Sequence, residues 1–260
     1  MIAAYSGKDE DHYKAIEEEI RSNKVGGVIF FQGDRTNFTE ALKRFNSASS
    51  LPLLVGMDAE WGVQMRLSGE ERFPYAYTLG AANDIENSEK IAAMMAQECR
   101  EMGIPVQTVV LNDDVLSAPK DQAHKRRGIG GLFLVWHVAG AKAEQMASLD
   151  EVVAVTAKAN ANTRTVGVGL TSCIVPANGK PTFSLPDNEM EIGLGIHGEP
   201  GIKRVKVRPI DSVIDEIMDA ILADLDYKGS DVALLVNGLG GSPAEELYVV
   251  YRRVKQICDA

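Results

Sequence analysis

Residues 26–57 read GGVIFFQGDRTNFTEALKRFNSASSLPLLVGM, and this stretch predicts a strand, a helix and a second strand in succession. The apolar run after the glycine pair is typical of a strand buried in a parallel sheet. Residues 36–47 have the spacing of an amphipathic helix, with Thr36 or Asn37 as its N-cap. Residues 52–57 form the next apolar run. A strand–helix–strand unit of this kind predicts an α/β fold with a mainly parallel sheet.

The same alternation of strands and helices extends from this unit in both directions. Apolar or β-branched runs predict further strands at residues 2–5, 106–111, 165–175, 190–196 and 231–236. Helical periodicity predicts helices at residues 12–22, 87–102, 130–147, 150–160, 212–225 and 243–258. No repeat or flexible linker interrupts the series.

Charge and composition exclude several classes of partner. The chain has 260 residues and a formal net charge of −10, which argues against nucleic acid and anionic membranes. The short basic cluster at residues 125–127 is expected to be a solvated turn. No apolar run approaches the ~20 residues that a membrane helix needs, and the first residues lack the pattern of a signal peptide.

The cysteines predict a reduced, cytoplasmic protein. They are odd in number, far apart and without the spacing of metal ligands: Cys99, Cys173 and Cys258. The adjacent acids of Asn112-Asp113-Asp114 are expected to be a solvated strand end rather than a metal site. The sequence therefore predicts neither a metal nor a cofactor.

The first part of the chain resembles the barrel domain of family-3 glycoside hydrolases. The resemblance rests on KVGGVIFFQG at residues 24–33, PLLVGMDAEWG at residues 52–62 and Arg72-Phe73-Pro74. It covers residues 1–103 and implies a half TIM-barrel-like fragment, about three strand–helix units of an eight-fold barrel. It also implies that Asp58, at a strand end, is a vestigial sugar subsite; the alternative is that Asp58 caps a turn.

Glycosidase activity is the least favoured function for this chain. The nucleophile and the general acid of the family come from later strands, and nothing here replaces them. Glycoside hydrolysis needs two carboxyl groups at a fixed separation, and Asp58 alone supplies one.

The second part, residues 104–260, resembles the dihydroxyacetone-binding subunit or domain of dihydroxyacetone kinases. The most specific motif is PDNEMEIGLGIHGEPG at residues 186–201. The resemblance continues in VVLNDDV (109–115), HKRRGIGG (124–131), CIVPA (173–177) and LGGSPAEELY (239–248).

This resemblance implies a chemical role for His197. In the family, the histidine of this motif forms a covalent hemiaminal with the carbonyl group of dihydroxyacetone. Neutral imidazole is nucleophilic near pH 7, so the chemistry is reasonable. Gly195 and Gly198 would let the backbone approach a small ligand closely, and Glu199 would orient the ring. Without the resemblance, His197 would be interpreted as an ordinary turn residue.

Other parts of the kinase machinery have no counterpart in the sequence. The family also uses a Gly-Gly-Gly-Ser-Gly-His-Glu-Pro-type segment and a downstream aspartate, whose region is occupied here by the glycosidase-like fragment. A pair of acid and base groups contributes ~10²–10⁴ in rate per group. The loop at residues 237–242 precedes a helix and lacks the lysine of a P-loop, so a tight turn is favoured over a phosphate site.

The sequence predicts an engineered chimera joined near residues 103–105, without complete catalytic machinery and with at most residual dihydroxyacetone binding through His197. The alternatives are a substrate-binding subunit of a dihydroxyacetone kinase and, last, a glycosidase. The two fragments form either separate domains or one merged domain. A half barrel exposes sheet edges, so it pairs with the second fragment or with another copy of the chain in a homo-oligomer.

Overall fold

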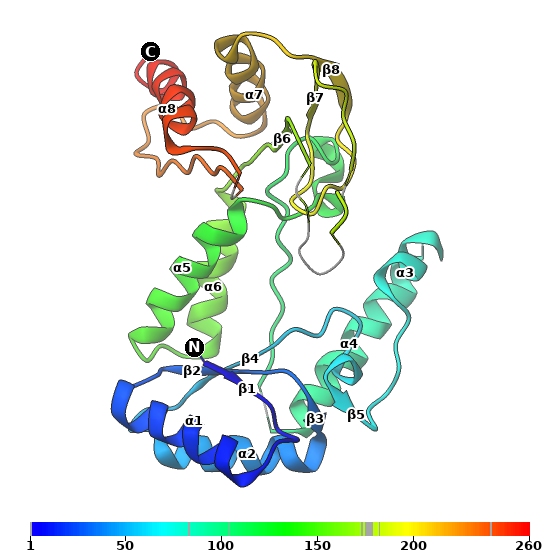
Figure 1. Ribbon diagram of the computed structural model, residues 1–260, viewed down its shortest axis with the longest axis vertical. Coiled ribbons are helices and arrows are strands. Elements are labelled where there is room, and N and C mark those ends of the chain that lie inside the picture. Colours follow the sequence, from blue (N-terminus) through cyan, green and yellow to red (C-terminus); the bar gives the residue numbers. More distant parts are fainter. Residues whose placement is uncertain are drawn as a thin grey trace. The chain divides into compact units, whose positions relative to one another are not determined.

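The computed structural model describes residues 2–82, 84–103, 105–172, 174, 179–181, 183–239 and 241–260. The chain divides into two compact units, Met1–Gln107 and Thr108–Ala260 (Figure 1).

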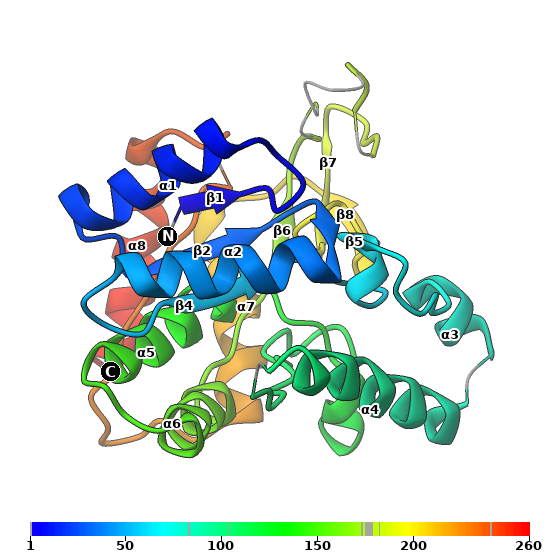
Figure 2. The same cartoon turned by 90° about the horizontal axis from the view of Figure 1, so that it is seen from below.

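The first unit is built on a parallel sheet with the strand order β1-β2-β4. Its strands are β1 (Ile2–Ala4), β2 (Gly27–Phe30) and β4 (Leu54–Met57). Helices α1 (Glu10–Asn23) and α2 (Arg35–Ala48) run alongside these strands and contact each other (Figure 2).

The core of this unit is aromatic. Phe30 of β2 and Phe38 of α2 are fully buried, and their ring centroids lie 4.6 Å apart in an edge-to-face arrangement. The N-cap of α2 is Asp34, which accepts a hydrogen bond from the backbone N–H of Asn37 at 2.9 Å. The expected cap at Thr36 or Asn37 is therefore wrong by two or three residues.

The rest of the first unit consists of short elements. Strands β3 (Gly33–Asp34) and β5 (Leu67–Ser68) pair in parallel, and η1 (Val63–Met65) precedes β5. Helices α3 (Ala76–Ala82) and α4 (Ile85–Glu101) follow. The α/β class and the parallel pairing are confirmed, but the described strands do not show a half TIM barrel.

The second unit joins two helix pairs to an antiparallel sheet. After the short η2 (Lys120–Lys125), α5 (Gly131–Glu144) and α6 (Leu149–Ala161) pack together as a hairpin. The sheet has the order β6-β7-β8, formed by β6 (Val168–Gly169), β7 (Glu189–Ile192) and β8 (Lys203–Lys206). Helices α7 (Ile210–Asp224) and α8 (Ala244–Cys258) lie against each other (Figure 1).

Two strand predictions for this region are wrong, and a third is confirmed only in part. Residues 106–111 and 231–236 form no strand, and residues 165–175 contribute only β6 among the part that is described. The named sheet of the second unit is antiparallel rather than parallel. An apolar run shows that a segment suits a sheet, but a strand forms only where a neighbour supplies the hydrogen bonds.

Among the described residues, no helix combines the length and the apolarity needed to cross a membrane.

Candidate functional site

His197 lies in a tight loop between two paired strands. Residues 193–202, called the His197 loop below, join β7 to β8, and Ile192 pairs with Lys203 at its base. Inside the loop, the N–H of Gly195 donates to the carbonyl of Glu199 at 2.9 Å, and the N–H of Gly198 donates to the carbonyl of Gly195 at 3.1 Å. These two hydrogen bonds connect residues within the loop and stabilise its fold.

Glu199 holds the ring and the backbone of His197 together. Its Oε1 lies 2.8 Å from Nδ1 of His197, and its Oε2 accepts the backbone N–H of His197 at 2.9 Å. Burial raises the pKa of Glu199, but the hydrogen bonds from His197 outweigh it and leave the pKa below its ordinary value. Because a carboxylate only accepts, the shared proton is assigned to Nδ1, which leaves Nε2 with a free lone pair. The side chain of His197 is 83% exposed, so this nitrogen is accessible.

Glycine is required by close approach at two positions of the loop. A Cβ at Gly195 would lie 2.2 Å from Oε2 of Glu199 and 2.8 Å from Nη1 of Arg127. A Cβ at Gly201 would lie 2.3 Å from the carbonyl oxygen of Ile192. Gly198 has a φ of +92°, in the region that favours glycine. The predicted glycines are therefore needed for the shape of the loop.

Arg127 contacts the same loop, a role that the sequence analysis did not predict. Its Nη2 donates to the carbonyl of Gly193 at 2.8 Å, and its Nη1 donates to the carbonyl of Pro200 at 3.4 Å. It also pairs with the fully buried carboxylate of Asp114 at 2.8 Å. Burial raises the pKa of Asp114, and the charge of Arg127 opposes that rise.

The acidic pair is fully buried and Arg126 of the basic cluster is buried as well, which corrects both expectations, whereas Lys125 is exposed. Arg126 is buried against Asp224 of α7, with two N–O distances of 2.9 and 2.7 Å. Asp113 is fully buried and accepts the backbone N–H groups of Ile129 and Gly131 at the start of α5. Opposite charges at short spacing, NDD followed by KRR, were the available signal, but only the tertiary structure shows that they meet.

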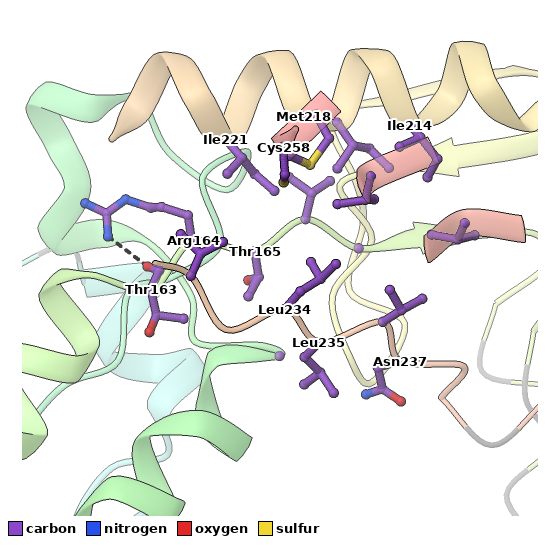
Figure 3. A pocket seen from close by; sticks show the side chains of 18 of the residues that line it. Thr163, Arg164, Thr165, Ile214, Met218, Ile221, Leu234, Leu235, Asn237 and Cys258 are labelled. Atoms are coloured by element: carbon purple, nitrogen blue, oxygen red, sulfur yellow. Dashed lines mark hydrogen bonds between the residues drawn. The ribbon is translucent and has the colours of Figure 1, made fainter. Parts of the chain in front are cut away.

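A large apolar cavity lies within the second unit, beside α7 and α8 (Figure 3). Its volume is about 1880 Å³, and Ile214, Met218 and Ile221 of α7 face Leu234 and Leu235 across it. Its lining includes Leu194 and Ile196 of the His197 loop but not His197.

Asp58 belongs to the first unit and is already paired. Its carboxylate lies 2.7 Å from Nη2 of Arg66, whose Nε also donates to the Asp58 carbonyl at 2.8 Å. Asp58 and His197 belong to different units of the chain, Met1–Gln107 and Thr108–Ala260.

Gly240 and Cys173 lie outside the described residues, as does most of the motif at residues 173–177. In the glycine-rich turn, the N–H groups of Gly241 and Ser242 both donate to the carbonyl of Gly238, so the turn closes on itself. Within the described ranges, no cluster of three His, Cys, Asp or Glu side chains is arranged to hold a metal ion.

The fold and the site define an α/β protein that presents a carboxylate-held histidine on a glycine-rich hairpin loop. The family model of the Dak1 domain matches residues 88–260. The chain belongs to the Dak1 domain family. The model of the glycosyl hydrolase family 3 N terminal domain matches residues 5–119.

Individual relatives agree with this assignment. The dihydroxyacetone-binding subunit DhaK of the PTS-dependent dihydroxyacetone kinase 2 of Listeria innocua is 42% identical over 177 residues, which are 68% of this chain and 52% of that subunit. The chain thus spans about half the length of that relative. The DhaK subunit of Lactococcus lactis is 30% identical over 254 residues, 97% of this chain and 68% of the subunit. The crystal structure of the dihydroxyacetone kinase of C. freundii has a similar fold, with a TM-score of 0.54 at 22% identity over 98% of this chain and 41% of that one.

These relatives overturn the prediction of an engineered chimera without complete catalytic machinery. The alignment with the Lactococcus lactis subunit runs through both units of this chain. One natural subunit therefore aligns with 97% of this chain. The resemblance of the first unit to family-3 glycoside hydrolases is matched by the family model over residues 5–119, but most of the same residues also align with a kinase subunit.

Proposed function

We propose that this chain is the dihydroxyacetone-binding part of a dihydroxyacetone kinase, and that His197 holds the substrate for phosphoryl transfer. The observation that carries the proposal is the contact of 2.8 Å between Nδ1 of His197 and Glu199, which leaves Nε2 free on an exposed loop. The relatives named above as dihydroxyacetone-binding subunits support the choice of ligand.

The chemistry is the addition of an imidazole N–H across a ketone. Nε2 of His197 forms a bond to the carbonyl carbon, and the π electrons of that bond move to the oxygen, which takes up a proton. The Nδ1 proton moves to Glu199, which releases it to solvent, and the alkoxide oxygen takes up one proton from solvent. Glu199 is then a carboxylate again, and the adduct is a neutral hemiaminal. Glu199 favours the step because it holds the reactive tautomer and because its negative charge stabilises the positive charge that develops on the ring.

The adduct would fix the ketone and leave its hydroxyl groups free. A phosphoryl group would reach one of them from a donor carried by a partner protein, as the name of the PTS-dependent relative suggests. Gly195 and Gly198 would let the backbone of the loop approach a small ligand closely. Two functional statements stay predictions: phosphoryl transfer in the complete assembly and pairing with another copy of the chain. The cytoplasmic location and the half-barrel origin of residues 1–103 are predictions as well.

The test is to titrate dihydroxyacetone into the purified chain by calorimetry and to follow ¹³C-labelled dihydroxyacetone by NMR. We expect saturable binding and a ketone carbon signal that moves into the region of tetrahedral carbon. Both effects should be absent in His197→Ala and retained in His137→Ala, which changes an exposed histidine on α5. Unchanged binding by His197→Ala, or no binding by the unmodified chain, would contradict the proposal.

A further inference from the structure

We infer that Arg127 is a positioning residue that holds the His197 loop in the shape needed for adduct formation. The inference rests on the proposed function, because it assigns Arg127 a role in binding dihydroxyacetone through His197.

The guanidinium of Arg127 donates hydrogen bonds to both ends of the His197 loop. Gly193 and Pro200 lie on either side of His197 in the sequence, and their carbonyl groups accept from Nη2 and Nη1 of Arg127 at 2.8 and 3.4 Å. A Cβ at Gly195 would lie 2.8 Å from Nη1, so the guanidinium also sits directly against the middle of the loop. Movement of Arg127 would therefore shift the backbone that carries His197 and Glu199.

Hydrogen bonds to Asp114 and Ser117 hold Arg127 in place. Its Nε and Nη2 donate to Oδ2 of Asp114 at 3.1 and 2.8 Å. Its carbonyl accepts the N–H of Asp114 at 3.0 Å, and its N–H donates to Oγ of Ser117 at 3.0 Å. Asp114 bridges to Thr165 in the neighbouring segment, so the anchor belongs to the framework of the second unit.

The geometry requires arginine rather than a positive charge alone. A guanidinium presents its N–H groups in a planar fork, which lets one side chain serve the Asp114 carboxylate and two carbonyl groups in different directions. A lysine would keep the charge beside Asp114, but its single nitrogen cannot span the carbonyl oxygens of Gly193 and Pro200 as well.

Arg126 provides the structural comparison. It neighbours Arg127 in the chain and is more deeply buried, but it pairs with Asp224 and donates to the carbonyl of Ala118. Among the described contacts, none joins its side chain to the His197 loop. Substitution of Arg126 is therefore expected to lower stability, whereas substitution of Arg127 should mainly affect the adduct.

The experiment compares Arg127→Lys, Arg126→Lys and the surface control Arg252→Lys, an α8 residue paired with Asp211. For each variant, the thermal midpoint and the fraction of ¹³C-labelled dihydroxyacetone in the adduct are measured at one ligand concentration. We expect Arg127→Lys to reduce the association constant of the adduct about tenfold, through the loss of two hydrogen bonds, with a thermal midpoint close to that of Arg252→Lys. Hydrogen exchange at residues 193–201 should become faster in Arg127→Lys alone.

The outcomes separate the inference from the proposed function. If the unmodified chain forms no adduct, the proposed function fails. If the unmodified chain forms it and Arg127→Lys forms it equally well, the inference alone fails. The inference also fails if Arg127→Lys lowers the thermal midpoint as much as Arg126→Lys, because Arg127 would then be a structural residue.

Discussion

Glu199 contacts His197 through both of its carboxylate oxygens, one at the ring Nδ1 at 2.8 Å and the other at the backbone nitrogen at 2.9 Å. This double contact fixes the orientation of the ring relative to the loop and not only its tautomer. A side chain that is 83% exposed would otherwise sample several rotamers. The histidine of the loop is therefore preorganised before any ligand arrives.

Glu199→Gln should weaken the binding of dihydroxyacetone without removing it. The amide oxygen can still accept from Nδ1, but the amide nitrogen would then face the backbone N–H of His197, which is also a donor. Since the pair is exposed, we expect only about a two- to fivefold loss of affinity at pH 7, measured by calorimetry. Glu144→Gln, at the exposed end of α5, is the control and should bind like the unmodified chain.

Gly195→Ala should disrupt the loop while leaving the fold intact. The new Cβ would meet Oε2 of Glu199 at 2.2 Å and Nη1 of Arg127 at 2.8 Å, so one of these side chains has to move. We expect the NMR signal of the adduct to fall at least about tenfold, from the loss of charge-assisted hydrogen bonds. Gly140→Ala, where nothing lies within 4 Å of the new Cβ, should bind normally and gain about 0.5–1 kcal/mol of stability as a helix substitution. Normal adduct formation by Gly195→Ala would show that this contact is unimportant.

The ion pair of Asp224 should make stability depend on pH in the acid range. The hydrogen bond from Arg126, together with that from Arg164, lowers the pKa of Asp224 from 3.8 to about 2 despite burial. A lowered pKa means that the contribution to stability is present above pH 3.8 and is lost as the pH falls through about 2. Asp224→Asn should therefore cost about 3 kcal/mol at pH 7, because the buried guanidinium of Arg126 loses the carboxylate that it pairs with.

Urea unfolding of both proteins at several pH values checks this expectation. The difference in the free energy of unfolding between the unmodified chain and Asp224→Asn should shrink as the pH falls from 3.8 toward 2. Asp219→Asn, an exposed substitution on the same helix, should show little difference at any pH. A difference that stays constant down to pH 2 would mean that the charge of Asp224 is not the cause.

Local patterns predicted the elements better than the contacts between them. The strand at Gly27–Phe30 and the helix at Ile210–Asp224 follow from apolar periodicity, and both were located within about two residues. The pairing of Arg127 with Asp114 was missed because charged residues are usually solvated, and burial of such a pair depends on segments far apart in the chain. His197 was found through its motif, whereas its contact with Glu199 required the folded loop.

The segment at residues 231–236 has the sequence of a strand but no strand partner, and this should be visible in hydrogen exchange. Among the described contacts, no backbone hydrogen bond joins it to another segment, and Val232 and Leu234 are about half exposed at the apolar cavity. Amides without hydrogen bonds exchange nearly as fast as those of an unfolded chain. We therefore expect rapid exchange at residues 231–236 and protection at Glu189–Ile192, whose β7 amides lie between two paired strands. Equal protection of the two segments would mean that residues 231–236 pair with another strand in solution and that the cavity is closed there.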